Sequence, residues 1–393
     1  MSSVKFVHSS MTGAPQLSGT AGSLIALLDA CLVNGFGGGN VDSLAINSNV
    51  VTATRSAGHP YEVGSVCEIA GASVTGGGTV NGQFIVTGVT TTTWTYAVTG
   101  VSNQTATGSI THKAAALGWE KPFSGTNLAV YRSPNVAGTR CFLRVNDTGT
   151  VDARAIGFEN MTDVNTGTGL FPTNVQLASG VFWTKSQTAD AITRPWIIVG
   201  DSRGFYLCIQ TASGNTNAYN TSYFGDINSV KSPDPYSCML AGFSTTRSFS
   251  SSAGSSNGDM QLISPAGPVD ASYLPRSSSG IGSAIQPRTS TLAMSISNSS
   301  YFSGASNNSG VLLFPNIGDN GLYIAPIYCI DNSPQLAYRG VIPGLYFSAQ
   351  AIGNSAFVSR EAVSSVTGYV GRTFRAIGNS SGVAFVDITG PWR

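Results

Sequence analysis

The sequence has little charge. Asp, Glu, Lys and Arg make up 10% of its 393 residues, whereas about 25% is usual in soluble proteins. A surface with so few charges must be covered by Ser, Thr, Asn and Gly. Such a surface suits a protein whose faces are occupied by neighbouring subunits, although a secreted β-protein fits the same composition. The formal net charge is +1 and no basic run occurs, so we expect no binding of nucleic acid.

Long apolar segments are missing too. The sequence contains no run of 18 or more apolar residues, and its first residues lack a charged region followed by an apolar core. We therefore expect neither a membrane span nor a signal peptide.

Motifs for metals and cofactors are also absent. The cysteines form no Cys-x-x-Cys pair, and the histidines, at positions 8, 59 and 112, lie away from the later cysteines, which argues against a zinc site. No Gly-Lys-Ser or Gly-Lys-Thr follows the glycine run 37–39, so we interpret that run as a flexible linker and not as a phosphate loop. We expect no cofactor and no metal. Free buried cysteines fit assembly in a reducing cytoplasm, and counting alone leaves a few disulfides open.

Catalytic groups are few. Residues 197–202 resemble the strand-then-Gly-Asp-Ser block of lipases and esterases, but that chemistry needs a later His base, and no His follows His112. We therefore interpret Gly200–Gly204 as a hairpin turn. Two pairs of acids could flank a sugar in a glycoside hydrolase and one stretch could hold calcium, although turn roles explain all of them: Asp226 with Asp234, Glu159 with Asp163, and 316–321. We expect no enzyme and no catalytic residue.

Glycine, by contrast, is abundant at 47 residues, and with many Ser and Thr it predicts a turn-rich, mainly β protein. One short helix is expected at about 20–34, because apolar residues recur there on one stripe. They are Leu24, Leu27, Leu28, Cys31 and Leu32. Ser18 or Thr20 is the expected N-cap, and Gly35 suits the C-terminal end. Residues 1–18 are interpreted as an extended arm that pairs with a neighbouring subunit or packs on its own domain.

Two β-domains are expected after the arm and helix at 1–40. The first is a small β-module at 41–113, in which apolar and polar residues alternate over 93–98 as in a half-buried strand. The second is a larger β-sandwich-like domain at 119–393, with a central hairpin of the apolar runs 196–199 and 205–209. The other expected features of this domain are short strands near 141–145, 291–296, 311–314, 322–330 and 341–347, and a Ser- and Gly-rich loop at 244–259.

Aromatic residues in polar stretches are the remaining sign of a binding surface. Six of them lie among Ser, Asn and Gly, which predicts loops and not alternating strands: Tyr219, Tyr223, Phe224, Tyr236, Tyr301 and Phe302. Exposed Tyr beside Asn suits stacking on a sugar or filling a pocket of a partner. Both roles predict the same residues, and plain loop packing is the third interpretation.

The small module contains four recognisable stretches: VGSVCEIAGA (63–72), NGQFIV (81–86), TWTY (93–96) and GSIT (108–111). Three more stretches lie outside it, at the start (Val4–Ser10), in the middle (Gly118–Asn127) and at the end (Phe374–Arg393) of the chain. The module resembles one that recurs in structural proteins of tailed bacteriophages and prophages. The outer stretches resemble a group of phage and prophage virion proteins. The resemblance thus spans the chain and includes no catalytic motif.

The resemblance implies a non-enzymatic structural component of a tailed-phage virion, assembled in the host cytoplasm and located in the tail, baseplate or adsorption apparatus. Its partners would be other virion proteins and copies of itself. Two alternatives stay open: a tail adhesin that binds a host-surface carbohydrate or receptor, and a capsid decoration protein. The low charge further predicts a multimer whose subunits meet through neutral surfaces. The strength of their association should depend little on salt.

Overall fold

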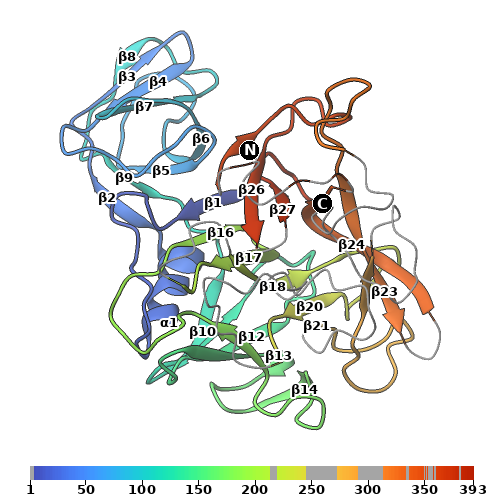
Figure 1. Cartoon of the computed structure of the whole chain (residues 1–393). Helices are drawn as coiled ribbons and strands as arrows, with labels where there is room; N and C mark the ends of the chain where they lie inside the picture. Colours follow the sequence, from blue (N-terminus) through green and yellow to red (C-terminus); the bar gives the residue numbers. More distant parts are fainter. Residues whose placement is uncertain are drawn as a thin grey trace.

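The structure, a computed structural model, describes residues 4–212, 219–244, 272–290, 313–332, 336–348, 350, 352, 357, 360–379 and 382–393. Over these residues the protein is mainly β, with one short helical segment and four antiparallel sheets (Figure 1), so the predicted fold class is confirmed. No helix in the described part of the chain is long and apolar enough to cross a membrane.

An eight-stranded sheet, here the small sheet, contains the strands between Phe36 and Ala114 and projects from the rest of the molecule (Figure 1). Its strands in spatial order are β2 (Phe36–Asn40), β9 (Thr111–Ala114), β5 (Val66–Ala70), β6 (Gly82–Val89), β7 (Thr93–Ala97), β4 (Val50–Thr54), β3 (Ser43–Asn47) and β8 (Gln104–Thr105). The strand predicted over 93–98 is confirmed, because Trp94 and Tyr96 of β7 are fully buried between more exposed neighbours.

The glycine run 37–39 is not a flexible linker, and that prediction is wrong. It lies inside β2, which pairs with β9. The glycines are needed for close packing: a Cβ on Gly37 would lie 2.5 Å from the carbonyl oxygen of Thr12, and Gly37 also has a φ of +64°. Any larger residue would be strained there in both respects.

A six-stranded sheet lies at the centre of the molecule and is called the central sheet (Figure 1). Its strands in order are β1 (Lys5–His8), β16 (Trp196–Gly200), β17 (Gly204–Ile209), β18 (Asn220–Asp226), β20 (Cys238–Ala241) and β21 (Ser272–Tyr273). The predicted hairpin is confirmed, since β16 and β17 pair antiparallel from Trp196 opposite Ile209 to Gly200 opposite Phe205. Every residue of both strands is buried, as expected for central strands.

The N-terminal arm belongs to the same chain's own core. Strand β1 pairs antiparallel with β16, with Lys5 opposite Gly200 and His8 opposite Ile197, and all four of its residues are buried. Of the two interpretations of this arm, packing on its own domain is confirmed for β1. The backbone groups on one edge of β1 find their partners in β16, and β1 is itself an edge strand of the central sheet.

Two further sheets flank the central sheet. The first, the β10–β15 sheet, consists of β10 (Glu120–Gly125), β11 (Leu128–Arg132), β12 (Phe142–Asn146), β13 (Asp152–Met161), β14 (Gly167–Phe171) and β15 (Val181–Thr184), the last paired with β13. The strand predicted at 141–145 is thus β12.

The second, the β22–β27 sheet, consists of β22 (Arg288–Ser290), β23 (Ala325–Asn332), β24 (Leu336–Phe347), β27 (Gly382–Asp387), β26 (Phe374–Asn379) and β25 (Ala362–Val363), with β19 (Asn228–Ser229) on β24. Strands β23 and β24 match the predictions at 322–330 and 341–347. The strand predicted at 291–296, half of that at 311–314 and nearly all of the loop at 244–259 lie outside the described residues. The described half of the second, Leu313 and Phe314, is not in a strand, so that prediction is wrong there.

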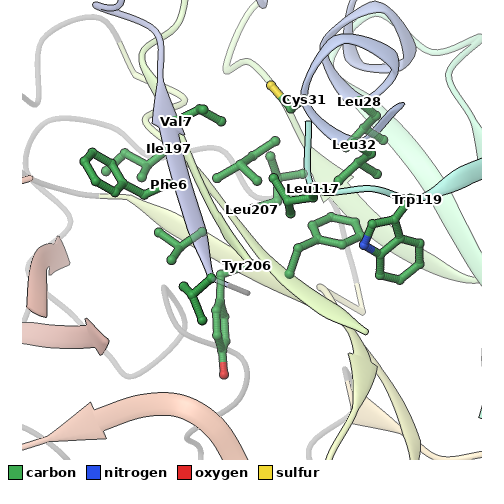
Figure 2. Close-up of a cluster of buried hydrophobic side chains, with 14 of the residues drawn as sticks. Phe6, Val7, Leu28, Cys31, Leu32, Leu117, Trp119, Ile197, Tyr206 and Leu207 are labelled. Carbon is green, nitrogen blue, oxygen red and sulfur yellow. The ribbon is translucent and has the colours of Figure 1, made fainter. Parts of the chain in front are cut away.

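The central sheet is covered on both faces. Phe205 and Phe224 are opposite each other across β17 and β18, and they contact Trp183 and Phe171 of the β10–β15 sheet. The next pair along, Tyr206 and Tyr223, points to the other face, where the Tyr206 hydroxyl donates to the Pro343 carbonyl at 2.6 Å. In Figure 2, Tyr206 points away from Leu117 and Trp119, which lie on the other side of the hairpin. The larger part of the protein is therefore a layered, sandwich-like structure.

The helical segment consists of α1 (Ser23–Leu28), which continues as a π-helix, η1 (Asp29–Asn34). The predicted helix at 20–34 is confirmed, although it begins three residues later. The expected apolar stripe is buried, and Leu28, Cys31 and Leu32 cover one side of the hairpin (Figure 2). Gly35 follows with a φ of +75° and ends the helix as expected.

The cap of this helix comes from a distant residue. The Ser18 and Thr20 hydroxyls lie 2.8 Å from each other and do not cap the helix. Instead, Oδ2 of Asp147 accepts from the backbone N–H groups of Leu24 and Ile25 at 2.7 and 3.1 Å. A carboxylate at this end is favoured by the helix dipole and satisfies two otherwise unpaired donors.

Glu62 ties the small sheet to the rest of the protein. It lies between β4 and β5, and its Oε1 accepts from Nε2 of His8 at 2.8 Å, while Oε2 accepts from Arg375 at 3.1 Å. His8 belongs to β1 and Arg375 to β26, so one carboxylate joins three sheets. The hydrogen bond from His8, and then the charges of His8 and Arg375, lower the pKa of Glu62 from 4.5 to about 2.

The Glu62 contact should weaken in acid. Because the folded-state pKa of Glu62 is lowered, its ionised form stabilises the fold fully above about pH 4.5, and this contribution is lost as the pH falls toward 2. We expect Glu62→Gln to lower the unfolding midpoint in urea at pH 6, with a gap to wild type that narrows steadily below pH 4.5. The effect should be modest, because the side chain is 41% exposed. A gap that stays constant down to pH 3 would contradict this assignment.

Candidate binding site

The predicted aromatic residues do not form one exposed surface. Tyr219, Tyr223 and Phe224 are buried, the last two in strand β18 of the central sheet, so the prediction that they lie in exposed loops is wrong. Polar neighbours such as Asn220 misled the interpretation, since these too are buried in the strand. Tyr236 is partly exposed and is covered by the Arg276 guanidinium, 4.8 Å above its ring. Tyr301 and Phe302 lie outside the described residues.

The acids that could have served in sugar cleavage are engaged elsewhere. Asp226 pairs with Arg203 at 2.8 Å, Asp234 with Arg339 at 2.7 Å, and Glu159 with Arg276 at 2.7 Å. Asp163 accepts from the backbone N–H groups of residues 165 and 166 and so closes a turn. These contacts favour structural roles for all four.

The contacts of the other predicted sites also favour structural roles. Asp201 Oδ1 accepts from the N–H groups of Arg203 and Gly204 at 2.8 and 2.9 Å, which makes residues 200–204 a hairpin turn. In the stretch 316–321, Asp319 accepts from the Gly321 N–H at 3.0 Å. The part of the chain that the structure describes contains no group of three or more His, Cys, Asp or Glu placed to hold a metal. All six cysteines are buried free thiols.

Three distant segments meet at the Asp201 turn. Trp119 Nε1 donates to the Asp201 carbonyl at 2.9 Å, and Arg393 donates to Asp201 Oδ2 at 2.7 Å. Lys5 is the register partner of Gly200, the residue before Asp201. The stretches 4–10, 118–127 and 374–393 therefore contribute to one structural centre of the protein.

A pocket of about 430 Å³ lies on the β10–β15 sheet, on the face turned away from the central sheet. Strand register explains how it forms: Asn146 of β12 is opposite Arg154 of β13, and Arg144 is opposite Ile156. These side chains alternate with Leu143, Val145 and Ala155, which face the core. The lining residues are Arg144, Asn146, Arg154, Ile156, Phe158, Asn165, Gly167, Leu170, Asn174 and Ser179.

The two arginines of this pocket have no carboxylate partner among the described residues. Arg144 donates through Nε to the Val164 carbonyl at 2.7 Å and through Nη2 to Asn165 Oδ1 at 3.1 Å. Arg154 donates through Nη2 to the carbonyls of Ala178 and Gly180, and its guanidinium lies 3.5 Å from the ring centre of Phe182. Burial lowers the pKa of both arginines, with Asp152 partly opposing this for Arg154.

A second hollow of about 210 Å³ adjoins the first and shares Leu170 and Asn174 with it. Its far wall is the Glu159–Arg276 ion pair, in which the two groups meet through two hydrogen bonds of 2.7 and 2.9 Å. Because the two hollows share lining residues beside β14, we call them together the β14 groove. Its first half is cationic and its second half is electrically balanced.

Sequence reasoning missed Arg144 and Arg154. Each is a polar residue at an outward-facing position of a strand, and polar residues are usual at such positions. What makes them a site is the register of β12 on β13, which the sequence does not reveal. No family model matches this chain, and no curated protein matches it with significant similarity.

Proposed function

We propose that this protein is a non-enzymatic structural component of a tailed-phage virion, placed in the tail, baseplate or adsorption apparatus. The observation that carries the proposal is the meeting of three segments at the Asp201 turn, because these are the stretches that resemble phage virion proteins. Because the similar stretches lie in the core, they favour a scaffold shared with those virion proteins and not a shared active site. The engaged acids support a role without catalysis.

The test is to locate the chain in intact particles of the phage or prophage that encodes it. We expect an electron cryo-microscopy map to contain the layered sheets in the tail or at its tip. Density on the head would favour capsid decoration instead. Absence from purified particles would overturn the proposal. Cleavage of a host polysaccharide that is abolished by Glu159→Gln or Asp226→Asn would overturn its non-enzymatic part.

The purified protein is expected to form a multimer whose mass changes little between low and high salt. Only 10% of its residues are charged, so few charges are available for salt to screen. Light scattering coupled to size-exclusion chromatography measures the mass at each salt concentration. A protein that stays monomeric at high concentration, with and without virion partners, would refute the multimer. If moderate salt dissociates the multimer, the protein is a multimer as expected, but the prediction of neutral contacts is refuted.

A second candidate function, attachment to a host-surface carbohydrate, is favoured by the β14 groove. An adhesin needs a surface recess with hydrogen-bonding groups that are not already paired. The first half of the groove offers donors for which no acceptor is seen among the described residues, on Nη1 of Arg144 and of Arg154, together with the exposed amide of Asn174.

A further inference from the structure

Unused hydrogen-bond donors remain on both arginines of the β14 groove. A guanidinium carries five N–H donors and no acceptor. Among the described residues, no acceptor lies on Nη1 of Arg144 or of Arg154, and Nε of Arg154 is buried without a partner. Donors left unpaired in a partly buried site are costly unless a ligand or water accepts from them.

The charge around these donors favours an anion. No carboxylate is among the residues that line the pocket. Asp152, the nearest one that acts on Arg154, accepts a hydrogen bond from the Thr184 hydroxyl. Two cations in one recess repel each other, so a bound oxyanion would relieve that repulsion and accept charge-assisted hydrogen bonds from both.

The rest of the pocket matches the body of a sugar. Three asparagines line the pocket: Asn146, Asn165 and Asn174. Oδ1 of Asn146 accepts from Thr148 and Oδ1 of Asn165 accepts from Arg144, so these two amides offer N–H donors to sugar hydroxyl groups, whereas the exposed Asn174 amide can both donate and accept. Leu170 of β14, half-buried opposite the buried Phe158 of β13, gives a small apolar surface for the C–H face of a sugar ring. The volume of about 430 Å³ suits a small ligand. Inorganic phosphate would accept hydrogen bonds from the arginines but would not contact the asparagine amides or the apolar surface.

We propose that the cationic half of the β14 groove binds a carboxylate-bearing sugar, with Arg144 and Arg154 holding the carboxylate and the asparagines holding the hydroxyl groups. The adjoining, electrically balanced half would then take the next, neutral residue of a polysaccharide. This assignment rests on the pocket alone, and it does not depend on the virion role proposed above.

The test is a ligand-observed NMR titration of the full chain with glucuronate, glucose and inorganic phosphate. We expect glucuronate to bind, glucose to bind at least tenfold more weakly, and phosphate to compete poorly. Arg144→Gln and Arg154→Gln should each weaken glucuronate binding about 10- to 100-fold, the usual effect of losing a charge-assisted hydrogen bond. Arg132→Gln is the matched control, because Arg132 lies on the same sheet but pairs with Glu120, and it should leave binding unchanged.

Folding is kept separate from binding by two further measurements. Arg154 also holds backbone carbonyls, so each variant is compared with wild type by thermal unfolding. Asn174→Ala changes an exposed lining residue for which no hydrogen bond is seen among the described residues, and we expect it to weaken glucuronate binding without lowering the melting temperature. Glucuronate binding that survives Arg144→Gln and Asn174→Ala would overturn the proposal. If glucose binds as tightly as glucuronate, the carboxylate is not recognised. If phosphate competes as well as glucuronate does, the sugar is not recognised. Either result would contradict the proposal.

Discussion

Replacing Arg339 with Met is expected to destabilise the protein by about 3–5 kcal/mol, the usual result of breaking a buried ion pair from one side. Arg339 is 1% exposed and pairs with both Asp234, at 2.7 Å, and Asp331, at 2.9 Å, which are equally buried. The substitution would leave two carboxylates buried without a cation. Urea unfolding followed by tryptophan fluorescence measures the free energy, and loss of soluble protein would be the extreme form of the same result.

The control for Arg339 is an exposed pair. Arg132 and Glu120 are 26% and 40% exposed, so Arg132→Met should change the free energy of unfolding by no more than about 1 kcal/mol. Arg339→Lys should recover only part of the lost stability, because a single ammonium cannot reach two carboxylates with the fork geometry of a guanidinium. Equal effects of Arg339→Met and Arg132→Met would contradict the structural role assigned to Arg339.

Replacing Asp147 with Ala is expected to have an effect of similar size, about 3–5 kcal/mol, for two reasons that act together. Asp147 forms an ion pair with Lys185 in which neither side chain is exposed, and it also caps the helix at Leu24 and Ile25. The change therefore strands a buried ammonium and two backbone N–H groups.

The two roles of Asp147 can be separated. Asp147→Asn keeps an oxygen for the cap but not the charge, and Lys185→Met removes the cation. The double variant Asp147→Asn/Lys185→Met should be more stable than Asp147→Asn alone, because it leaves no buried charge without a partner. Unfolding free energies from urea titration decide this. A double variant that is less stable than both single variants would show that the ammonium is not the main source of the cost.

The elements that the sequence predicted well are those with a complete local pattern. The helix at 23–34 has an apolar stripe over about three turns, and the hairpin at 196–209 has two apolar runs around a turn. Strand β2 and strand β18 lack such a pattern, since one is glycine-rich and the other begins with Asn, Thr and Ser. Both are strands because neighbouring strands offer hydrogen bonds to their backbones, and the tertiary fold, not the local sequence, decides which strands are neighbours.

The candidate site was harder to predict than the fold. The sequence pointed to Tyr223 and Phe224 as contacts because their neighbours are polar, whereas the structure buries them between layers. Arg144 and Arg154 attracted no attention, because nothing in either segment shows that the two strands pair. Long-range register also explains the cap by Asp147, which lies more than a hundred residues from the helix it serves.

The pairing of β1 with β16 has a consequence for synthesis of the chain. Strand β1 leaves the ribosome before its partner, because residues 197–200 are made about 190 residues later. At ordinary rates of translation this gap lasts roughly 10–40 s. During that time Phe6 and the backbone edge of β1 have no partner from the central hairpin, and closing so long a loop is slow even when the hairpin is present. Neighbouring nascent chains on one message therefore present the same unpaired strand side by side, and exchange of β1 between them is the misassembly to which this topology is most exposed.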